Sequence, residues 1–230
     1  MVDIIRMSFF GNSNIGIYAY ANDKVLLIPP GLKEVDVREM ASALGVEPIE
    51  AKVAGTTLNG VFIAGNNRAI ILPHIIFQDE LMRLRSAISE RGVDVEIIVS
   101  ESKLTALGNV LLCNDRGCIG SPLIEEPTLR RIEDSLGVEV VKARLVNMEV
   151  PGGVSVISNR GGVIHPDASE DDIRVLKDVT KVSVEPATVN AGIPFVKSGI
   201  IANNKGVVVG GITTGPEIFR IKAGFEGGGV

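Results

Sequence analysis

The sequence repeats itself five times, and this periodicity constrains the fold more than any single residue does. In each copy a short apolar strand leads into a turn centred on an asparagine: Asn22, Asn66, Asn114, Asn159 and Asn203. These positions are 44, 48, 45 and 44 residues apart. A fixed period of this length is typical of repeat architectures, in which one unit cannot bury its own apolar face. Five copies with no remaining segment predict a closed ring and not an open array.

A second strand, a helix and a third strand follow each turn. The second strands are uninterrupted apolar runs at 25–28, 69–72, 117–120, 162–164 and 206–209, which indicate burial on both faces. Asn, Asp and Gly in the turns tolerate the positive φ that tight hairpins require. Helical spacing then begins, and in the first copy Asp36 is the predicted N-cap. Thr214 and Glu217 predict a capping box in the last copy.

The fifth copy lacks a third strand, because the chain ends soon after Gly224. Residues 2–6 have the alternating character of the third strand at 93–98, so we predict that they complete the last unit. The predicted fold is therefore a single α/β domain over 1–230. Its strand–strand–helix–strand repeats, related by pseudo-fivefold symmetry, are expected at 9–53, 54–100, 101–144, 145–188, and 189–230 plus 1–8.

Charge and hydropathy exclude several classes of function. The net charge is −5, from 23 basic and 28 acidic residues. Proteins that wrap nucleic acid need a basic face, so an acidic body better suits docking on a basic protein. No apolar run approaches the roughly 18 residues that span a bilayer, and the first residues do not form a signal segment. We expect a cytoplasmic protein that does not enter membranes.

The two cysteines, Cys113 and Cys118, flank the third turn. Across a hairpin their Cβ atoms could approach disulfide distance. The interpretation that we favour is two small apolar residues on neighbouring strands of a cytosolic protein. Two ligands are too few for a structural metal site, so no metal is expected.

Four segments, in order and in register with the repeat, carry a family resemblance. They are Leu104–Asn109, Cys113–Asp115, Ser158–Pro166 and Gly211–Glu217. A closed ring of such units resembles the pentein fold. Within that fold the chain resembles the archaeal and eukaryotic translation initiation factor 6 family of ribosome anti-association factors, over essentially its whole length.

The resemblance implies a function without catalysis or cofactor. Members of the family bind the large ribosomal subunit on the face that meets the small subunit, beside the sarcin–ricin loop. Their main contact is a ribosomal protein, with limited rRNA contact, and the bound factor blocks subunit joining. A role in large-subunit maturation, a monomeric state, and release by an elongation-factor-like GTPase with the Shwachman–Diamond protein are implied in the same way.

The resemblance also implies partner-binding residues. The asparagine of the family's Leu-Gly-Asn segment lies on the subunit-binding face, which corresponds here to Asn109, with Leu107 in the same segment. Residues one past the glycine that leads the first strand in other copies are expected to share this rim: Ile17, Val61 and Val154. An alternative for Asn109 is a structural side chain bonded to local backbone.

Two other functional classes stay open at this stage. The pentein fold also contains guanidine-modifying enzymes, which use a cysteine nucleophile, a histidine and acidic residues. Here His74 and His165 border Pro73 and Pro166 at matching repeat positions, which favours a structural role over one catalytic histidine. We therefore expect no catalytic residue. A repeat scaffold that binds some other protein is the third possibility.

Overall fold

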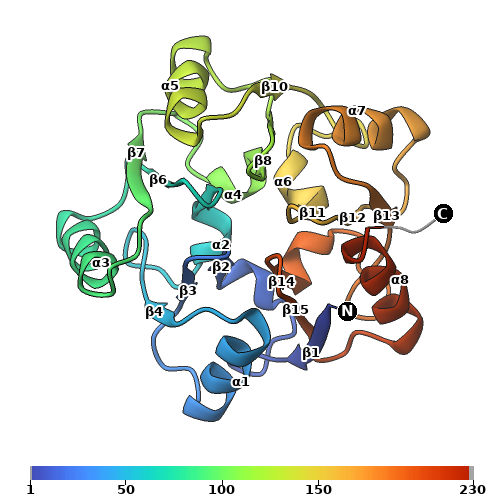
Figure 1. Ribbon diagram of the computed structural model, residues 1–230, viewed down its shortest axis with the longest axis horizontal. Helices are drawn as coiled ribbons and strands as arrows, with labels where there is room; N and C mark the ends of the chain where they lie inside the picture. Colours follow the sequence, from blue (N-terminus) through green and yellow to red (C-terminus); the bar gives the residue numbers. More distant parts are fainter. Residues whose placement is uncertain (1, 228–230) are drawn as a thin grey trace.

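Small mixed sheets form the inner part of the molecule, and long helices cover them on the outside. The structure is a computed structural model that describes residues 2–227. Over that range it contains five three-stranded sheets. Figure 1 shows the sheets grouped around one centre. Met1 and residues 228–230 of the predicted domain lie outside the described residues.

Four of the sheets are each built from one continuous stretch of chain. The first strand pairs antiparallel with the second, which pairs parallel with the third. These strands are β2 (Tyr20–Ala21), β3 (Leu26–Ile28) and β4 (Pro48–Glu50); β5 (Ala64–Gly65), β6 (Ala69–Pro73) and β7 (Glu96–Ser100); β8 (Leu111–Cys113), β9 (Cys118–Gly120) and β10 (Val140–Lys142); and β11 (Ser155–Ile157), β12 (Gly162–Ile164) and β13 (Val184–Pro186).

A long helix connects the second strand to the third in each of these units, as parallel pairing requires. The helices are α1 (Glu34–Leu44), α3 (Gln78–Glu90), α5 (Glu126–Leu136) and α7 (Glu170–Thr180). Gly45 and Gly137 cap α1 and α5 in the left-handed conformation that glycine favours, with φ of 59° and 67°. The predicted N-cap of α1 is wrong, because the helix already begins at Glu34, after Lys33.

The fifth sheet joins the two ends of the chain. It consists of β14 (Ile200–Ala202), β15 (Gly206–Gly210) and β1 (Asp3–Met7), and α8 (Gly215–Phe225) follows β15. β1 pairs parallel with β15, from Asp3 beside Gly206 to Met7 beside Gly210. The predicted pairing of the N-terminal strand with the last unit is therefore present. The capping box of Thr214 and Glu217 is also confirmed.

A one-turn helix, which the sequence pattern does not predict, precedes each first strand. These short helices are η1 (Ile15–Ile17), α2 (Asn59–Phe62), α4 (Leu107–Val110), α6 (Pro151–Val154) and η2 (Val196–Gly199). Each contacts the next one along the chain, and η2 contacts η1.

The five turns are connected by hydrogen bonds from unit to unit. A main-chain N–H in each turn donates to a side-chain Oδ1 in the next: Asp23 to Asn67, Asn67 to Asp115, Asp115 to Asn159, Asn159 to Asn204, and Asn204 to Asp23, all at 2.8–2.9 Å. Asn159 therefore occupies the same position in its turn as Asp23, Asn67, Asp115 and Asn204 do in theirs. Ser158, not Asn159, occupies the position of Asn22 in the fourth copy, because its main-chain oxygen accepts from the Asn114 amide.

The buried core consists of five clusters, each shared by two neighbouring units. Leu27 and Ile49 of the first unit pack in one cluster with Leu72, Leu84 and Ile88 of the second. Neighbouring units thus cover one another's apolar faces, which is the physical reason for the repeat. Within residues 2–227, no helix has the length and apolar character needed to cross a membrane.

Candidate functional site

The strand directions give the molecule two chemically different ends. Each second strand runs from its turn to the start of a long helix, and each first strand, antiparallel to it, begins at a short helix. The short helices and the N-termini of the long helices therefore share one end, here called the short-helix end. The hydrogen-bonded turns and the C-termini of the long helices lie at the other, the turn end.

Glycines allow the short helices to pack against one another. A Cβ on Gly60 would lie 2.0 Å from the Gly16 carbonyl oxygen, and one on Gly108 would lie 2.2 Å from that of Gly60. Gly152 approaches Gly108 in the same way, at 2.4 Å, and Gly16 approaches Lys197, at 2.0 Å. These contacts assign Gly16, Gly60, Gly108, Gly152 and Lys197 to equivalent positions. Only glycine fits at four of them, because real Cβ atoms do not come so close to backbone.

The residues that follow these five positions form a half-buried rim: Ile17, Val61, Asn109, Gly153 and Ser198. The prediction placed Ile17, Val61 and Asn109 together, and the structure does bring them to equivalent positions. Val154 is one residue out of register, since Gly152 and not Gly153 is the packed glycine. Val154 and Leu107 are both fully buried in the core, so neither side chain is available to a partner.

The local hydrogen bonding does not explain Asn109. Its main-chain N–H donates to the Ala106 carbonyl oxygen within the short helix. Within residues 2–227, its side-chain amide makes no hydrogen bond, and Gly153, its neighbour on the rim, has no side chain to cover it. The alternative of a side chain bonded to local backbone is therefore absent from this structure. Asn109 keeps both donors and its acceptor available at the surface.

Exposed apolar side chains lie in loops at this same end. Phe10 packs edge-on against Tyr18, which follows η1, with ring centroids 5.7 Å apart. Phe77 lies beside Gly55, in the loop before α2. Six large apolar side chains in these loops are 41–60% exposed: Phe10, Phe77, Leu123, Ile193, Phe195 and Ile212. Exposed apolar surface of this kind is where soluble proteins bind partners when it is contiguous. Sequence reasoning did not select these residues, because each stands in an irregular loop.

The short-helix end also carries carboxylates, some of them ion-paired, as Glu34 is with Arg38. All five long helices have a carboxylate in their first turn, as in Glu34 and Asp36 of α1 or Glu170 and Asp171 of α7. Basic side chains at the turn end instead bind main-chain carbonyl oxygens. Lys205 Nζ donates to Gly45 at 2.8 Å, and Arg116 Nη1 donates to Lys181 at 3.1 Å. Both arrangements complement the helix dipoles.

Carboxylates hold the loops in front of the short helices. Glu217 accepts from the main-chain N–H groups of Gly192 at 2.8 Å and Thr214 at 2.7 Å, and from the Thr188 hydroxyl at 2.8 Å. Burial opposes its ionisation, but these donors outweigh burial and lower the pKa of Glu217 to about 2. Glu80 binds the loop before α2 in the same manner.

The residues considered for catalysis are not brought together as a catalytic site. Cys113 and Cys118 are joined by a disulfide, so the interpretation of two free cysteines is wrong, and both sulfurs are unavailable as nucleophiles. His165 is buried and accepts from the main-chain N–H of Asp167 at 3.1 Å. Residues 2–227 contain no group of three His, Cys, Asp or Glu side chains placed to hold a metal ion.

The family model and the curated relatives agree on one family. Residues 4–224 match the model of the eIF-6 family. A translation initiation factor 6 from Staphylothermus marinus is 49% identical over 229 residues, covering 100% of both chains. Those from Pyrococcus horikoshii and Saccharolobus solfataricus are 37% and 40% identical, and each alignment covers 95% or more of both chains. A solved dimethylarginine dimethylaminohydrolase aligns with 94% of this chain and 75% of its own, with a TM-score of 0.48 and 12% identity.

Proposed function

The chain belongs to the eIF-6 family of translation factors, and from this premise we propose that it docks on the intersubunit face of the large ribosomal subunit and prevents the small subunit from joining. The observation that carries the proposal is the chemistry of the short-helix end. An apolar surface bordered by acidic helix N-termini suits a basic ribosomal protein, because apolar contact supplies affinity and opposite charge speeds association. Contact with rRNA is limited in this proposal, because the body is acidic.

The proposal includes a closed ring of five repeats with pseudo-fivefold symmetry, of the pentein type. The pairing of β1 with β15 supports it, and so does the hydrogen bond from the last turn to the first. A ring of this kind is a rigid disc, so that its rim reaches a partner without rearrangement. Binding then costs little conformational entropy, and the bulk of the disc blocks the approaching subunit by volume alone.

The rim residues Asn109, Ile17 and Val61 form the centre of the proposed docking surface. The unpaired amide of Asn109 would hydrogen-bond to the partner's backbone, while Ile17 and Val61 would lose water on contact. In this proposal the factor acts as a cytoplasmic monomer and takes part in large-subunit maturation. Its release requires an elongation-factor-like GTPase with the Shwachman–Diamond protein.

Sedimentation of purified subunits tests the proposed function. Added protein should comigrate with the large subunit, leave the small subunit free, and lower the fraction of joined ribosomes in proportion to its occupancy. Normal joining at full occupancy would overturn the anti-association role, and comigration with the small subunit alone would overturn the docking partner.

A further inference from the structure

Three loops without a charged residue meet where the fifth unit adjoins the first. They are residues 8–14, 187–195 and 211–214, which follow β1, β13 and β15, and none contains Asp, Glu, Lys or Arg. In the other three units the loops before the short helices are charged, at Lys52, Glu101, Lys103, Arg144 and Glu149. The three uncharged loops are here called the neutral sector of the short-helix end.

Asn190 joins the loops of the neutral sector by hydrogen bonds. Its side-chain amide donates to the Ser13 carbonyl oxygen at 2.8 Å, and its main-chain N–H donates to the Thr213 hydroxyl at 3.2 Å. Gly211 also lies against the first loop, since a Cβ there would be 2.4 Å from Ser8 Oγ. The three loops therefore pack directly against one another, and the side chains that they expose belong to one surface.

Each loop of the neutral sector exposes a large apolar side chain, and the second exposes two. Phe10, Ile193, Phe195 and Ile212 are four of the six exposed apolar side chains in the loops of the short-helix end. The polar groups among them are hydroxyls and side-chain amides. An apolar surface that is depleted of charge has the composition of the core of a protein–protein interface.

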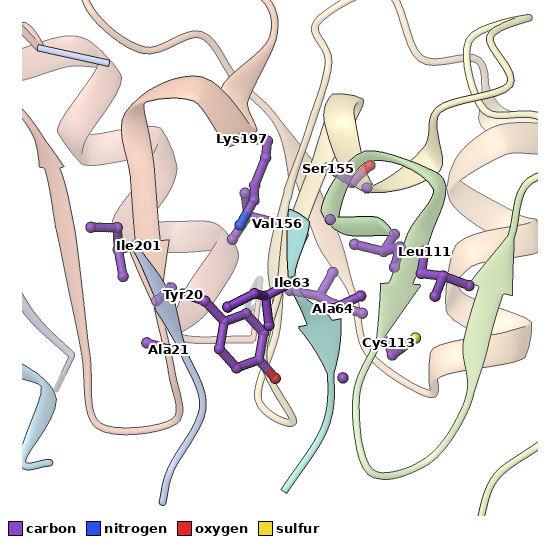
Figure 2. A pocket seen from close by; sticks show the side chains of 16 residues that line it. Tyr20, Ala21, Ile63, Ala64, Leu111, Cys113, Ser155, Val156, Lys197 and Ile201 are labelled. Atoms are coloured by element: carbon purple, nitrogen blue, oxygen red, sulfur yellow. The ribbon is translucent and has the colours of Figure 1, made fainter. Parts of the chain in front are cut away.

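Two charges that border these loops are turned away from the surface. Figure 2 shows the side chain of Lys197, which follows the second loop, pointing from η2 into the central cavity. Glu217 is buried beyond the third loop, and its carboxylate accepts from main-chain N–H groups of two of the loops. Arg6 and Glu185 lie outside the loops, in β1 and β13. The loops of the neutral sector therefore present no charge to a partner.

Phe10 stands at a backbone position that favours other residues. Its φ is 54°, in the left-handed region that Gly and Asn adopt readily and bulky residues rarely do. Its side chain contacts Tyr18 edge-on and is more than half exposed. Neither the backbone conformation nor burial in the core accounts for an aromatic residue here. Strained residues of this kind are concentrated at functional sites.

We propose that the neutral sector is the apolar anchor of the docking surface and binds an uncharged, apolar segment of a ribosomal protein, with Phe10 and Phe195 as its main contacts. This inference rests on the proposed function. A basic segment or an RNA backbone would leave its charges without partners here, because the loops offer neither a carboxylate nor a cation. Aromatic side chains bury large apolar areas and often dominate the energetics of an interface. The charged contacts of the partner then fall on the other units.

Substitutions of the two phenylalanines test the sector separately from docking itself. Phe10→Asn and Phe195→Ser should each weaken binding to purified large subunits about tenfold or more, by the same factor at low and high salt, because no charge is removed. Phe10→Asn should melt at or above the wild-type temperature, since Asn tolerates the left-handed backbone. Phe77→Ser is the matched control, because Phe77 is similarly exposed at the same end but lies beside charged residues. It should bind within about threefold of wild type.

Benzoylphenylalanine in place of Phe195 identifies what covers the sector. On irradiation it should label a protein of the large subunit, within a run of uncharged residues. If wild type itself does not bind the large subunit, the proposed function fails, and this inference fails with it. If wild type binds, the neutral sector alone is overturned by normal affinity of Phe10→Asn and Phe195→Ser, by an equal loss in Phe77→Ser, or by a label on rRNA or on a charged segment. A Phe10→Asn variant that melts below wild type would also contradict the role given to Phe10.

Discussion

The main-chain N–H of Asn204 donates to Oδ1 of Asp23 over 2.8 Å, although 181 residues separate the two. The side-chain amides of Asn67 and Asn204 also donate to Asp23, both to Oδ2. The bond from Asn67 is 2.6 Å long. One carboxylate thus connects the first turn to the second and the fifth. These contacts are charge-assisted, the stronger class of hydrogen bond in proteins, and they bring the last unit directly against the first.

Asp23→Ala should therefore lower the free energy of unfolding by about 1–3 kcal/mol, since half-buried donors lose a charged acceptor. Urea denaturation measures the change. Asp94→Ala is the matched control, because the Asp94 side chain is fully exposed and lies 3.9 Å from Lys24 in a surface ion pair. Equal, small effects of the two substitutions would contradict a linking role for Asp23.

Glu217 should make stability depend on acid. Its pKa falls from an ordinary 4.5 to about 2 on folding, so its contribution is complete above pH 4.5 and is lost as the pH falls towards 2. Glu217→Gln should cost about 1–3 kcal/mol at pH 7 and much less near pH 2, because the amide cannot replace a charged acceptor. Thermal melts from pH 7 to 2 give the two curves. A difference in stability between wild type and Glu217→Gln that does not change with pH would exclude the ionised carboxylate as its cause. The control Glu90→Gln, on the exposed end of α3, should behave as wild type.

Neighbouring glycines should differ sharply in tolerance. Gly108→Ala places a Cβ 2.2 Å from the Gly60 carbonyl oxygen, so the short helices must separate, at a cost of about 1–3 kcal/mol or more. In Gly153→Ala the new Cβ meets its nearest atoms, in Val150, at 3.5 Å, an ordinary contact. We expect its stability to stay within about 0.5 kcal/mol of wild type. Guanidinium denaturation of the two variants measures the change in stability. Equal losses of stability in Gly108→Ala and Gly153→Ala would contradict the close packing of the short helices.

Asn109→Ala should weaken binding to the large subunit roughly ten- to a hundredfold, the usual cost of leaving a partner group unpaired at an interface. Its melting temperature should stay near that of wild type, because the side-chain amide makes no internal hydrogen bond. Fluorescence titration with large subunits gives the dissociation constant, with Glu90→Ala at the turn end as the control. Normal affinity, or a large loss of stability, would mean that Asn109 does not carry the contact.

The sequence indicates the large features of the fold because chemistry repeats with the units. Asn and Asp recur where turns require them, and the alternating residues 2–6 reveal the strand that pairs with β15. One-turn helices such as α2 are too short to show an apolar period, so they were missed. The doublet Gly152–Gly153 leaves the register of the rim ambiguous, and only contact with Gly108 resolves it.

Other features depend on spatial contacts that the sequence alone does not contain. Ser158 and Asn159 are adjacent, and only hydrogen bonds to Asn114 and Asn204 tell their positions apart. The Cys113–Cys118 disulfide requires the pairing of β8 with β9, in which these two residues face each other. Lys197 could have been found by aligning the five copies on their packed glycines, since it stands at the position where the other four copies have glycine.

Site-directed cross-linking tests most directly which end of the molecule docks on the ribosome. A photoreactive residue in place of Leu123, exposed at the short-helix end, is compared with one in place of Arg116, exposed at the turn end. The probe at 123 should cross-link to a protein of the large subunit, and the probe at 116 should not. Cross-links from 116 alone, or none from 123 in a complex that still sediments together, would contradict it.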